Sequence, residues 1–518
     1  MKKLHLLFIG ILSMSTIYAQ DISDAIRFSQ DEIQGSARFR ALSGAFGALG
    51  GDMSAVSLNP AGSAVFSRSH ASFSLSSKEI ENNTQYFNGV NNSSESNFDI
   101  NQGGAAFVFA SNTNSPWRKF TIAIAYERTN DHDNNWRASG VNTDNDPNFN
   151  NSIASYFYDH ANNPDNAVRL GDILLRDGES FTDAYIDIGN APQLGFSHQQ
   201  AFLGYWSFIL EPDDNNNDDN TSYISNIAPG NFNHDYIYTS TGYNGKVTFN
   251  MATQYEDNLY LGLNLNSHFI DYERSTLLFE DNSNTGSIVN SVEFENGLST
   301  TGSGFSFQLG GILKLSNEFR VGVTYDSPTW YTIEEESTQY LSTVRDEGSG
   351  PEVQVINPNV INVHPQYKLQ TPSKLTGSLA YVFGKQGLIS FDYSRKDYSQ
   401  TKFRPTSDYI DLNNNISNIL TDASTYRLGG EYKYKQFSFR GGYRFEESPY
   451  ADGITIGDLT GYSLGIGYNF GNTKLDITYD QSERSSVNSF YNLRFDRPAS
   501  AEVDRTNSNI TLSLSFNI

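Results

Sequence analysis

The chain has 518 residues, no cysteine and a formal net charge of −24 at pH 7. The missing cysteines exclude disulfides, thiolate metal sites, a cysteine nucleophile and a lipoprotein anchor, and the negative charge makes nucleic acid a poor partner. Hydrophobic residues make up only 37 % of the chain and aromatic residues 14 %, which suits strands with aromatic girdles at membrane interfaces and also a soluble all-β protein.

The first 19 residues have the pattern of a secretory signal peptide. Lys2 and Lys3 make a basic start, an apolar stretch runs from Leu6 to Leu12, and Ala19 offers a small-residue cleavage site. The apolar stretch is too short to cross a bilayer as a helix, and no later stretch approaches 18 apolar residues. We therefore expect an exported protein without a transmembrane helix.

Residues 20–66 are small and glycine-rich, and they end in a turn signal. Proline fixes φ and glycine tolerates positive φ, so the Asn-Pro-Ala-Gly tetrad suits a sharp reversal of the chain. We expect a compact segment inside a β-barrel, and a plain surface turn before the first strand is the alternative. The residues singled out here are Gly44, Gly47, Gly50, Gly51, Asn59, Pro60, Ala61 and Gly62.

From residue 67 onward, most of the chain alternates apolar and polar residues. Period-two alternation places one set on each face of a sheet, and in a membrane barrel the apolar set faces lipid. The pattern predicts fourteen strands: 67–77, 98–111, 119–130, 238–255, 259–265, 305–315, 319–327, 374–383, 388–398, 425–434, 437–448, 459–470, 473–485 and 507–518. With fourteen strands, short turns such as 384–387 and 471–472 fall on the periplasmic side and the long loops fall outside.

Gly103 and Gly104, followed by two alanines, give the second predicted strand little side-chain volume. Glycines inside strands mark bulges and close approaches. We expect a kink or a lateral gap in the wall at this point.

Residues 131–236 break the alternation with Asn/Asp clusters, possible short helices near 151–175 and an apolar run at 201–210. A loop of this length is uncommon unless it is functional or disordered. The apolar run either packs the loop against its own small core or forms an apolar landing surface for a substrate. The candidate substrate-binding residues are Phe202, Leu203, Tyr205, Trp206, Phe208 and Ile209.

Catalytic and metal signals are weak. His70 and Ser72 have the His-x-Ser spacing of outer-membrane phospholipases but lack the Asn-Gly that follows in that family. Acyl transfer requires a nucleophile, an oriented base and oxyanion donors together, and the sequence offers no such set. The acidic stretch 211–220 carries Ca²⁺-type oxygen ligands without EF-hand spacing. We expect a solvated acidic loop, no catalytic residues, no metal site and no cofactor.

Several motifs together resemble the FadL/TodX family of outer-membrane transport proteins for long-chain fatty acids and other hydrophobic compounds. They are the Gly/Ala-rich segment, the tetrad at 59–62, and the stretches 371–377, 426–432, 439–443 and 448–449. The resemblance covers roughly residues 21–130 and 237–518. The final four residues, 515–518, also resemble the closing-strand signal read by the outer-membrane assembly machinery, although they end on Ile where many such proteins end on Phe.

The resemblance implies an all-β, fourteen-stranded antiparallel transmembrane β-barrel with an N-terminal hatch in the lumen, located as a monomer in a Gram-negative outer membrane. It implies contact with outer-membrane lipid and passive uptake of small hydrophobic molecules. The steps would be capture in the outer loops, gating by the hatch, and lateral or periplasmic release. The alternative function is a FadL-like binding or scaffold barrel, for example in type IX protein secretion. A continuous hydrophobic path would favour transport, and a capped, polar lumen would favour the scaffold.

Overall fold

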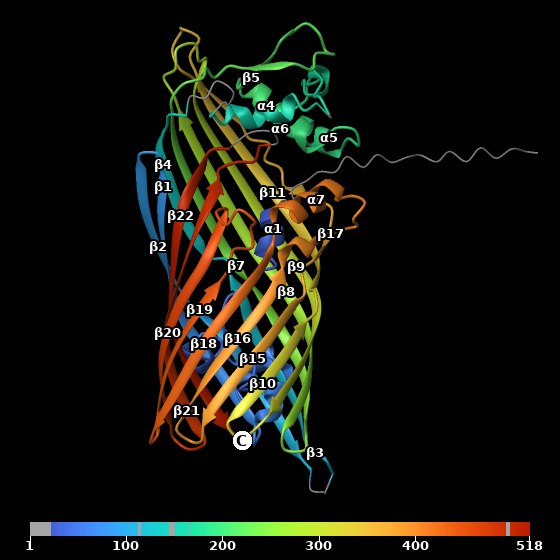
Figure 1. Ribbon diagram of the computed structural model, residues 1–518. Coiled ribbons are helices and arrows are strands. Elements are labelled where there is room, and N and C mark those ends of the chain that lie inside the picture. The colour runs from blue at the N-terminus through green and yellow to red at the C-terminus, as the bar shows by residue number, and fades with distance from the viewer. Residues whose placement is uncertain (1–21, 112–114, 145–150, 165, 494–497) are drawn as a thin grey trace, which may run out of the picture.

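The computed structural model describes residues 22–111, 115–144, 151–164, 166–493 and 498–518. Antiparallel strands close into a tall barrel that holds the N-terminal segment, residues 22–66, inside it and carries helices over one end (Figure 1). The predicted signal peptide, 1–19, lies outside the described residues. No helix among the described residues is long and apolar enough to cross a membrane.

Within the described residues, fourteen strands form the wall, and the first pairs with the last to close it. This confirms the predicted fold class and strand number. The strands are β1 (His70–Tyr86), β2 (Gly89–Ala110), β3 (Trp117–Asp131), β7 (Phe232–Tyr255), β8 (Leu259–Asp281), β9 (Val289–Lys314), β10 (Phe319–Asp326), β15 (Lys374–Phe383), β16 (Gly387–Asp397), β18 (Asp422–Tyr434), β19 (Phe437–Glu446), β20 (Ile456–Asn469), β21 (Thr473–Ser489) and β22 (Ser500–Asn517).

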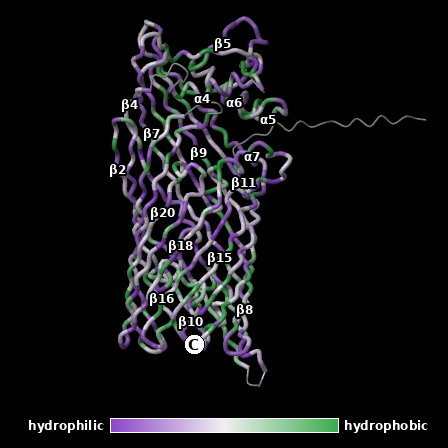
Figure 2. The backbone as a smooth tube through the Cα atoms, viewed as in Figure 1, coloured by the Kyte–Doolittle hydropathy of each residue, from purple (hydrophilic) through white to green (hydrophobic). Residues whose placement is uncertain are grey.

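Apolar side chains face outward along these strands, the reverse of a soluble protein. In β3, Phe120, Ile122 and Ile124 are 43–45 % exposed, whereas Thr121 and Ala123 between them are buried. The same alternation of hydrophobic and hydrophilic positions marks the strands of the lower barrel (Figure 2). A closed ladder satisfies every strand backbone group, which is what allows such a wall to stand in lipid.

The two ends of the barrel differ. One end, called the turn end, carries the short connections 256–258, 315–318, 384–386, 435–436 and 470–472 and the C-terminus, and the loop end carries the helices (Figure 1). The segments predicted as short turns and as the long loop therefore lie at opposite ends. Which end faces the periplasm stays a prediction.

Several strands extend further than the predicted ranges. Residues 78–97 were expected to be a loop, but they continue β1 and β2 to a tight hairpin. Likewise, β4 (Asn134–Asn142) pairs with the first part of β7. The outward faces of these stretches are mostly polar and their inward faces carry only a few apolar residues, such as Ile80 and Trp136, so hydrophobic alternation does not reveal them; beyond the lipid band the ladder does not need an outward apolar face. The loop end also holds β11 (Trp330–Arg345), β12 (Glu352–Ile356), β13 (Asn362–Val363), β14 (Tyr367–Gln370) and β17 (Lys402–Arg404).

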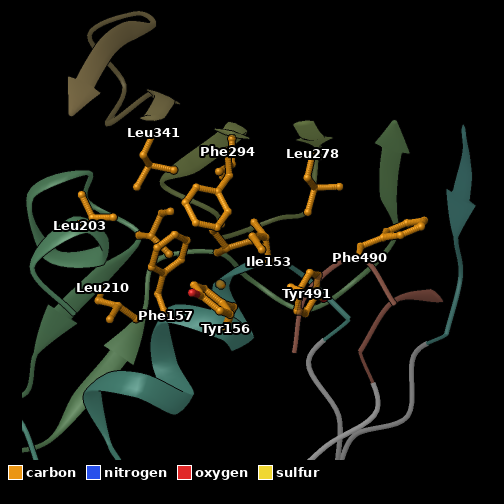
Figure 3. Close-up of a cluster of buried hydrophobic side chains, with 14 of the residues drawn as sticks. Ile153, Tyr156, Phe157, Leu203, Leu210, Leu278, Phe294, Leu341, Phe490 and Tyr491 are labelled. Atoms are coloured by element: carbon orange, nitrogen blue, oxygen red, sulfur yellow. The ribbon is translucent and has the colours of Figure 1, made fainter. Parts of the chain in front are cut away.

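The described residues between β4 and β7 form the cap. Its elements are α4 (Ala154–Ala161), η2 (Leu170–Asp172), α5 (Phe181–Asn190), α6 (Phe196–Trp206), β5 (Leu210–Pro212) and β6 (Tyr223–Ser225). A buried apolar cluster joins cap residues such as Phe157 and Leu203 to Leu278, Phe294 and Leu341 from the barrel strands (Figure 3). Two further helical pieces, η3 (Tyr398–Gln400) and α7 (Ile410–Ile419), lie between β16 and β18. The cap therefore rests on the barrel through a core of its own.

The N-terminal segment is built from short capped turns: α1 (Ile22–Arg27), α2 (Ala37–Ala41), α3 (Met53–Leu58) and η1 (Pro60–Val65). Ser36, Asp52 and Asn59 each cap the following turn by accepting a hydrogen bond from a backbone N–H, the usual role of these residue types. The segment begins towards the loop end and descends inside the barrel to the turn end (Figure 1).

Candidate functional site

All eight residues singled out in residues 20–66 lie inside the barrel, and only Gly51 among them is not fully buried. The glycine run and the tetrad pack against each other. Gly50 has φ +62°, and an added Cβ would lie 2.9 Å from the backbone of Gly62. The Gly51 N–H also donates to the Gly62 carbonyl at 3.0 Å. The sharp turn at 59–62 therefore stacks on the glycine run, and both positions need glycine for this close approach.

Four amide side chains of the barrel wall hold the backbone of the N-terminal segment. They form what we call the amide girdle: Asn101 donates to the Gly35 carbonyl (2.9 Å), Asn250 to Pro60 (2.9 Å), Asn264 to Val56 (2.8 Å) and Gln308 to Ser57 (2.9 Å). The girdle is buried. Buried carbonyls outside a ladder need partners, and the girdle supplies these partners through side chains.

Asn59 joins the two parts of the segment to the wall. Its side-chain oxygen accepts from the Ala61 N–H at 3.1 Å, and its amide nitrogen donates to the carbonyls of Gly47 (2.7 Å) and Gly311 (3.2 Å). The side chain is buried, so all three hydrogen bonds replace water that is no longer available.

Charged groups of the wall also hold the segment. Asp392 accepts from the backbone N–H groups of Phe46 and Gly47, both at 2.9 Å. Arg40 donates twice to Asp480, at 2.8 and 2.9 Å, and Arg38 reaches Glu431 at 3.1 Å.

Wall glycines bring the two backbones together. A Cβ added to Gly262 would lie 2.3 Å from the Pro60 carbonyl carbon, and one added to Gly322 would lie 2.3 Å from the Gly47 oxygen. The segment therefore fills the barrel near its turn end, fitted to this wall.

Wall strands and several residues of the segment between Ser23 and Arg40 line a cavity of about 340 Å³, which we call the chamber. Its lining is mainly polar: nine Lys or Arg residues and six Asp or Glu residues line it, with apolar side chains such as Ile456, Leu459 and Val503 among them. Of the two alternatives, a continuous hydrophobic path does not describe this lining, which is closer to a polar lumen. Apolar alternation alone does not reveal the charged residues that line the chamber. Charges at the inward positions of β18 and β19, flanked by outward Tyr and Phe residues, are the signal that would have found them.

Backbone pairing between β2 and β3 ends just beyond Gly103 and Gly104, on the side towards the loop end. Gly103 and Gly104 pair with β1 on one side and with β3 on the other. An added Cβ on Gly104 would lie 2.9 Å from the Met53 side chain, so this glycine makes room for the N-terminal segment. The break begins at Asn101, where the β1–β2 register shifts and the β2–β3 pairing has ended.

Beyond this break, which we call the seam, side chains rather than backbone groups connect the strands. Arg128 forms an ion pair with Asp99, Asn97 donates to Asp133 at 2.5 Å, and Lys78 lies 3.3 Å from Asp131. The seam is thus closed by polar contacts.

The apolar run forms the end of α6 and the residues after it. Phe202, Leu203 and Ile209 are completely buried in the cap core, which fits the interpretation that the run packs the loop. Tyr205, Trp206 and Phe208 are partly buried against the same core. The Trp206 ring N–H donates to the Ile173 carbonyl at 2.9 Å.

The His-x-Ser pair has ordinary structural partners. The His70 ring stacks on Phe66 at 4.6 Å and approaches Asn517 at 3.0 Å, while Ser72 donates to Gln102 at 3.2 Å. Within the part of the chain that the structure describes, no three His, Asp or Glu side chains are grouped to hold a metal ion.

Comparison with known proteins places this architecture. The family model described as "Outer membrane protein transport protein (OMPP1/FadL/TodX)" matches residues 220–518. A Pseudomonas aeruginosa FadL homologue is 12 % identical, with a TM-score of 0.53, over 94 % of this chain and 99 % of that chain. The P. putida toluene transporter TodX is 11 % identical, with a TM-score of 0.50, over the same shares. At such identities these two structures show the fold alone, and no curated protein sequence matches. Because the family model covers more than half of the chain, the protein belongs to the OMPP1/FadL/TodX family of outer-membrane transport proteins and is a non-enzymatic β-barrel of the outer membrane.

Proposed function

We propose that the protein is a passive channel for small hydrophobic or amphipathic molecules and that residues 22–66 act as its hatch. The observation that carries this proposal is the chamber, which has a separate, packed segment as its floor. A molecule in the chamber can pass on towards the turn end only when that floor or the wall beside it moves. The mixed lining, with Ile456 and Leu459 near charged groups, suits a molecule that has an apolar body and a polar group.

The way the hatch is held supports movement without unfolding of the barrel. Apart from the seam, backbone ladders join the wall strands, whereas the hatch is held by the amide girdle, by Asn59 and by a few ion pairs. Each neutral hydrogen bond contributes only about 0.5–1.5 kcal/mol net. A segment held by such contacts opens locally at a lower free energy than the ladder.

We place lateral release at the seam, because backbone pairing between β2 and β3 has ended there. Breaking the Arg128–Asp99 and Lys78–Asp131 ion pairs would open the wall without breaking a ladder hydrogen bond. Release through the turn end is the other route. Capture outside is assigned to the partly exposed Tyr205, Trp206 and Phe208 of the cap.

A reversible disulfide tests the hatch, because the chain has no cysteine of its own. The Ser43 and Ser463 hydroxyls lie 2.9 Å apart, one on the hatch and one on β20. In cells that display Ser43→Cys/Ser463→Cys, oxidation should abolish uptake of radiolabelled toluene and oleate, and reduction should restore it. The matched control is Thr376→Cys/Ser394→Cys, which joins two wall strands whose hydroxyls lie 2.8 Å apart. Uptake that persists in the fully oxidised Ser43–Ser463 protein contradicts gating by the hatch.

The second candidate function is a binding or scaffold barrel, and the charged lining of the chamber beneath a packed cap favours it. Such a barrel needs no hatch movement. A folded wild-type protein that supports uptake of neither probe would favour this function over the channel.

A further inference from the structure

Two pairs of arginines face each other across neighbouring strands of the chamber wall. Arg427 of β18 lies directly opposite Arg444 of β19, and Arg484 of β21 lies directly opposite Arg505 of β22. All four line the chamber. Like charges placed directly opposite each other destabilise a sheet, so these two pairs need an explanation.

Carboxylates of the protein neutralise the four guanidinium groups only in part. Among the described residues, the ion pairs that reach them end on Glu446, which lies 3.7 Å from Arg444 and 3.6 Å from Arg484. Both contacts are too long for hydrogen bonds. Asp480 on the same wall is already held by two hydrogen bonds from Arg40.

Three of the arginines also carry a buried nitrogen without a hydrogen-bond partner: Nε of Arg427, Nε of Arg484 and Nη2 of Arg505. Buried donors are nearly always paired, and an unpaired one points to a missing partner. A guanidinium group presents its donors as a planar fork that matches carboxylate and phosphate oxygens. The unpaired donors and the excess positive charge thus call for the same kind of partner.

The wall leaves space for this arrangement. An added Cβ on Gly461 of β20 would lie 2.9 Å from Nε of Arg444, so glycine lets this side chain lie across the strand between the two pairs. The lining as a whole holds more basic than acidic residues, although the chain carries a net charge of −24. Basic residues are therefore concentrated around the chamber.

We infer that the four arginines form a binding site for a small organic dianion, such as a phosphate monoester or a dicarboxylate. Among the described residues, only Glu446 lies within ion-pair distance of the four guanidinium groups, so a dianion neutralises the site better than a single carboxylate does. This inference deepens the proposed function, on which it rests in taking the chamber as the place that receives the solute.

Titration calorimetry on the folded protein in detergent tests the site, with inorganic phosphate, succinate and octanoate as probes. We expect at least one of the two dianions to bind more tightly than octanoate. Phosphate alone would identify phosphate esters as the ligand class, and succinate alone would identify dicarboxylates. The double variant Arg427→Gln/Arg505→Gln should weaken dianion binding at least tenfold. The control Arg395→Gln changes an exposed arginine that pairs with Asp422 at 2.7 Å, and it should bind like the wild type. Octanoate binding more tightly than both dianions, or equal dianion binding by the double variant, overturns the site.

Chemical protection of the wild-type protein covers the case in which the double variant does not fold. Phenylglyoxal should modify Arg427 and Arg505 more slowly when the bound dianion is present, while the modification of Arg395 stays unchanged. Equal modification with and without the dianion contradicts the site. If the protein binds the dianion but uptake stays unchanged when the Ser43–Ser463 disulfide forms, the binding site is retained and the channel is rejected. If the disulfide blocks uptake and reduction restores it, but no dianion binds, only the binding site is rejected.

Discussion

Replacing Asn59 by alanine should loosen the hatch while leaving the barrel folded. The substitution removes three buried hydrogen bonds, to Ala61, Gly47 and Gly311. Two of these bonds lie within the hatch and one reaches the wall; at about 0.5–1.5 kcal/mol each, their loss destabilises the closed hatch by roughly 1.5–4.5 kcal/mol relative to a locally unfolded one, in which all three are broken. Since every 1.4 kcal/mol is about a tenfold change in an equilibrium constant, the open population should rise by roughly ten- to a thousandfold.

Planar-bilayer conductance measures this change directly. Wild-type protein should show rare openings, and Asn59→Ala should open frequently, with a melting temperature of the barrel close to that of the wild type. The matched control is Asn266→Ala. Asn266 is a buried wall asparagine whose hydrogen bonds, among the described residues, go to the wall residues Thr248 and Ser306 and to the girdle member Gln308 at 2.8–3.4 Å. Conductance unchanged in Asn59→Ala, or raised equally in both variants, would show that these hydrogen bonds do not hold a gate.

Three further predictions concern the fit of the hatch, the orientation of the barrel and the pH response of the cap. Gly262→Ala should also raise conductance, because its Cβ would lie 2.3 Å from the Pro60 backbone and would displace the hatch. Unchanged conductance would show that the wall moves instead of the hatch. A cysteine at Asn216 should react with an impermeant label on intact cells and one at Asn472 should not. The opposite pattern would show that the orientation of the barrel in the membrane is the reverse of the predicted one. Burial lowers the pKa of His160 in α4 from 6.5 to about 4, so the cap should lose stability as pH falls from about 6.5 to 4, because the unfolded state takes up the proton first. Limited proteolysis of the cap should show this loss, and His160→Gln should remove part of it, the rest coming from His198 in α6, whose pKa burial also lowers; equal pH dependence in both proteins rules out His160.

The strands of the wall could be predicted from sequence because lipid imposes a local rule. A strand such as β3 must show apolar residues to lipid and small or polar residues to the lumen, and this alternation can be read within ten residues. The turn at 59–62 is equally local, since proline and glycine restrict or release the backbone themselves. The ends of β1 and β2 could not be read this way, because the outward face of residues 78–97 is mostly polar and does not follow the lipid rule.

The chamber, by contrast, depends on contacts between residues far apart in sequence. Arg427 and Arg505 lie on strands separated by three others, and only closure of the barrel turns both towards the hatch. The fate of the apolar run was likewise undecided by sequence, since the core that buries Phe202 combines cap residues with Phe294 of β9 and Leu341 of β11. Alternation tells which face of a strand a residue occupies, and it carries no information about what lies opposite that face. That partner is fixed by barrel closure and by the path of the hatch, so the grouping of these charges around one chamber was decided by the tertiary structure.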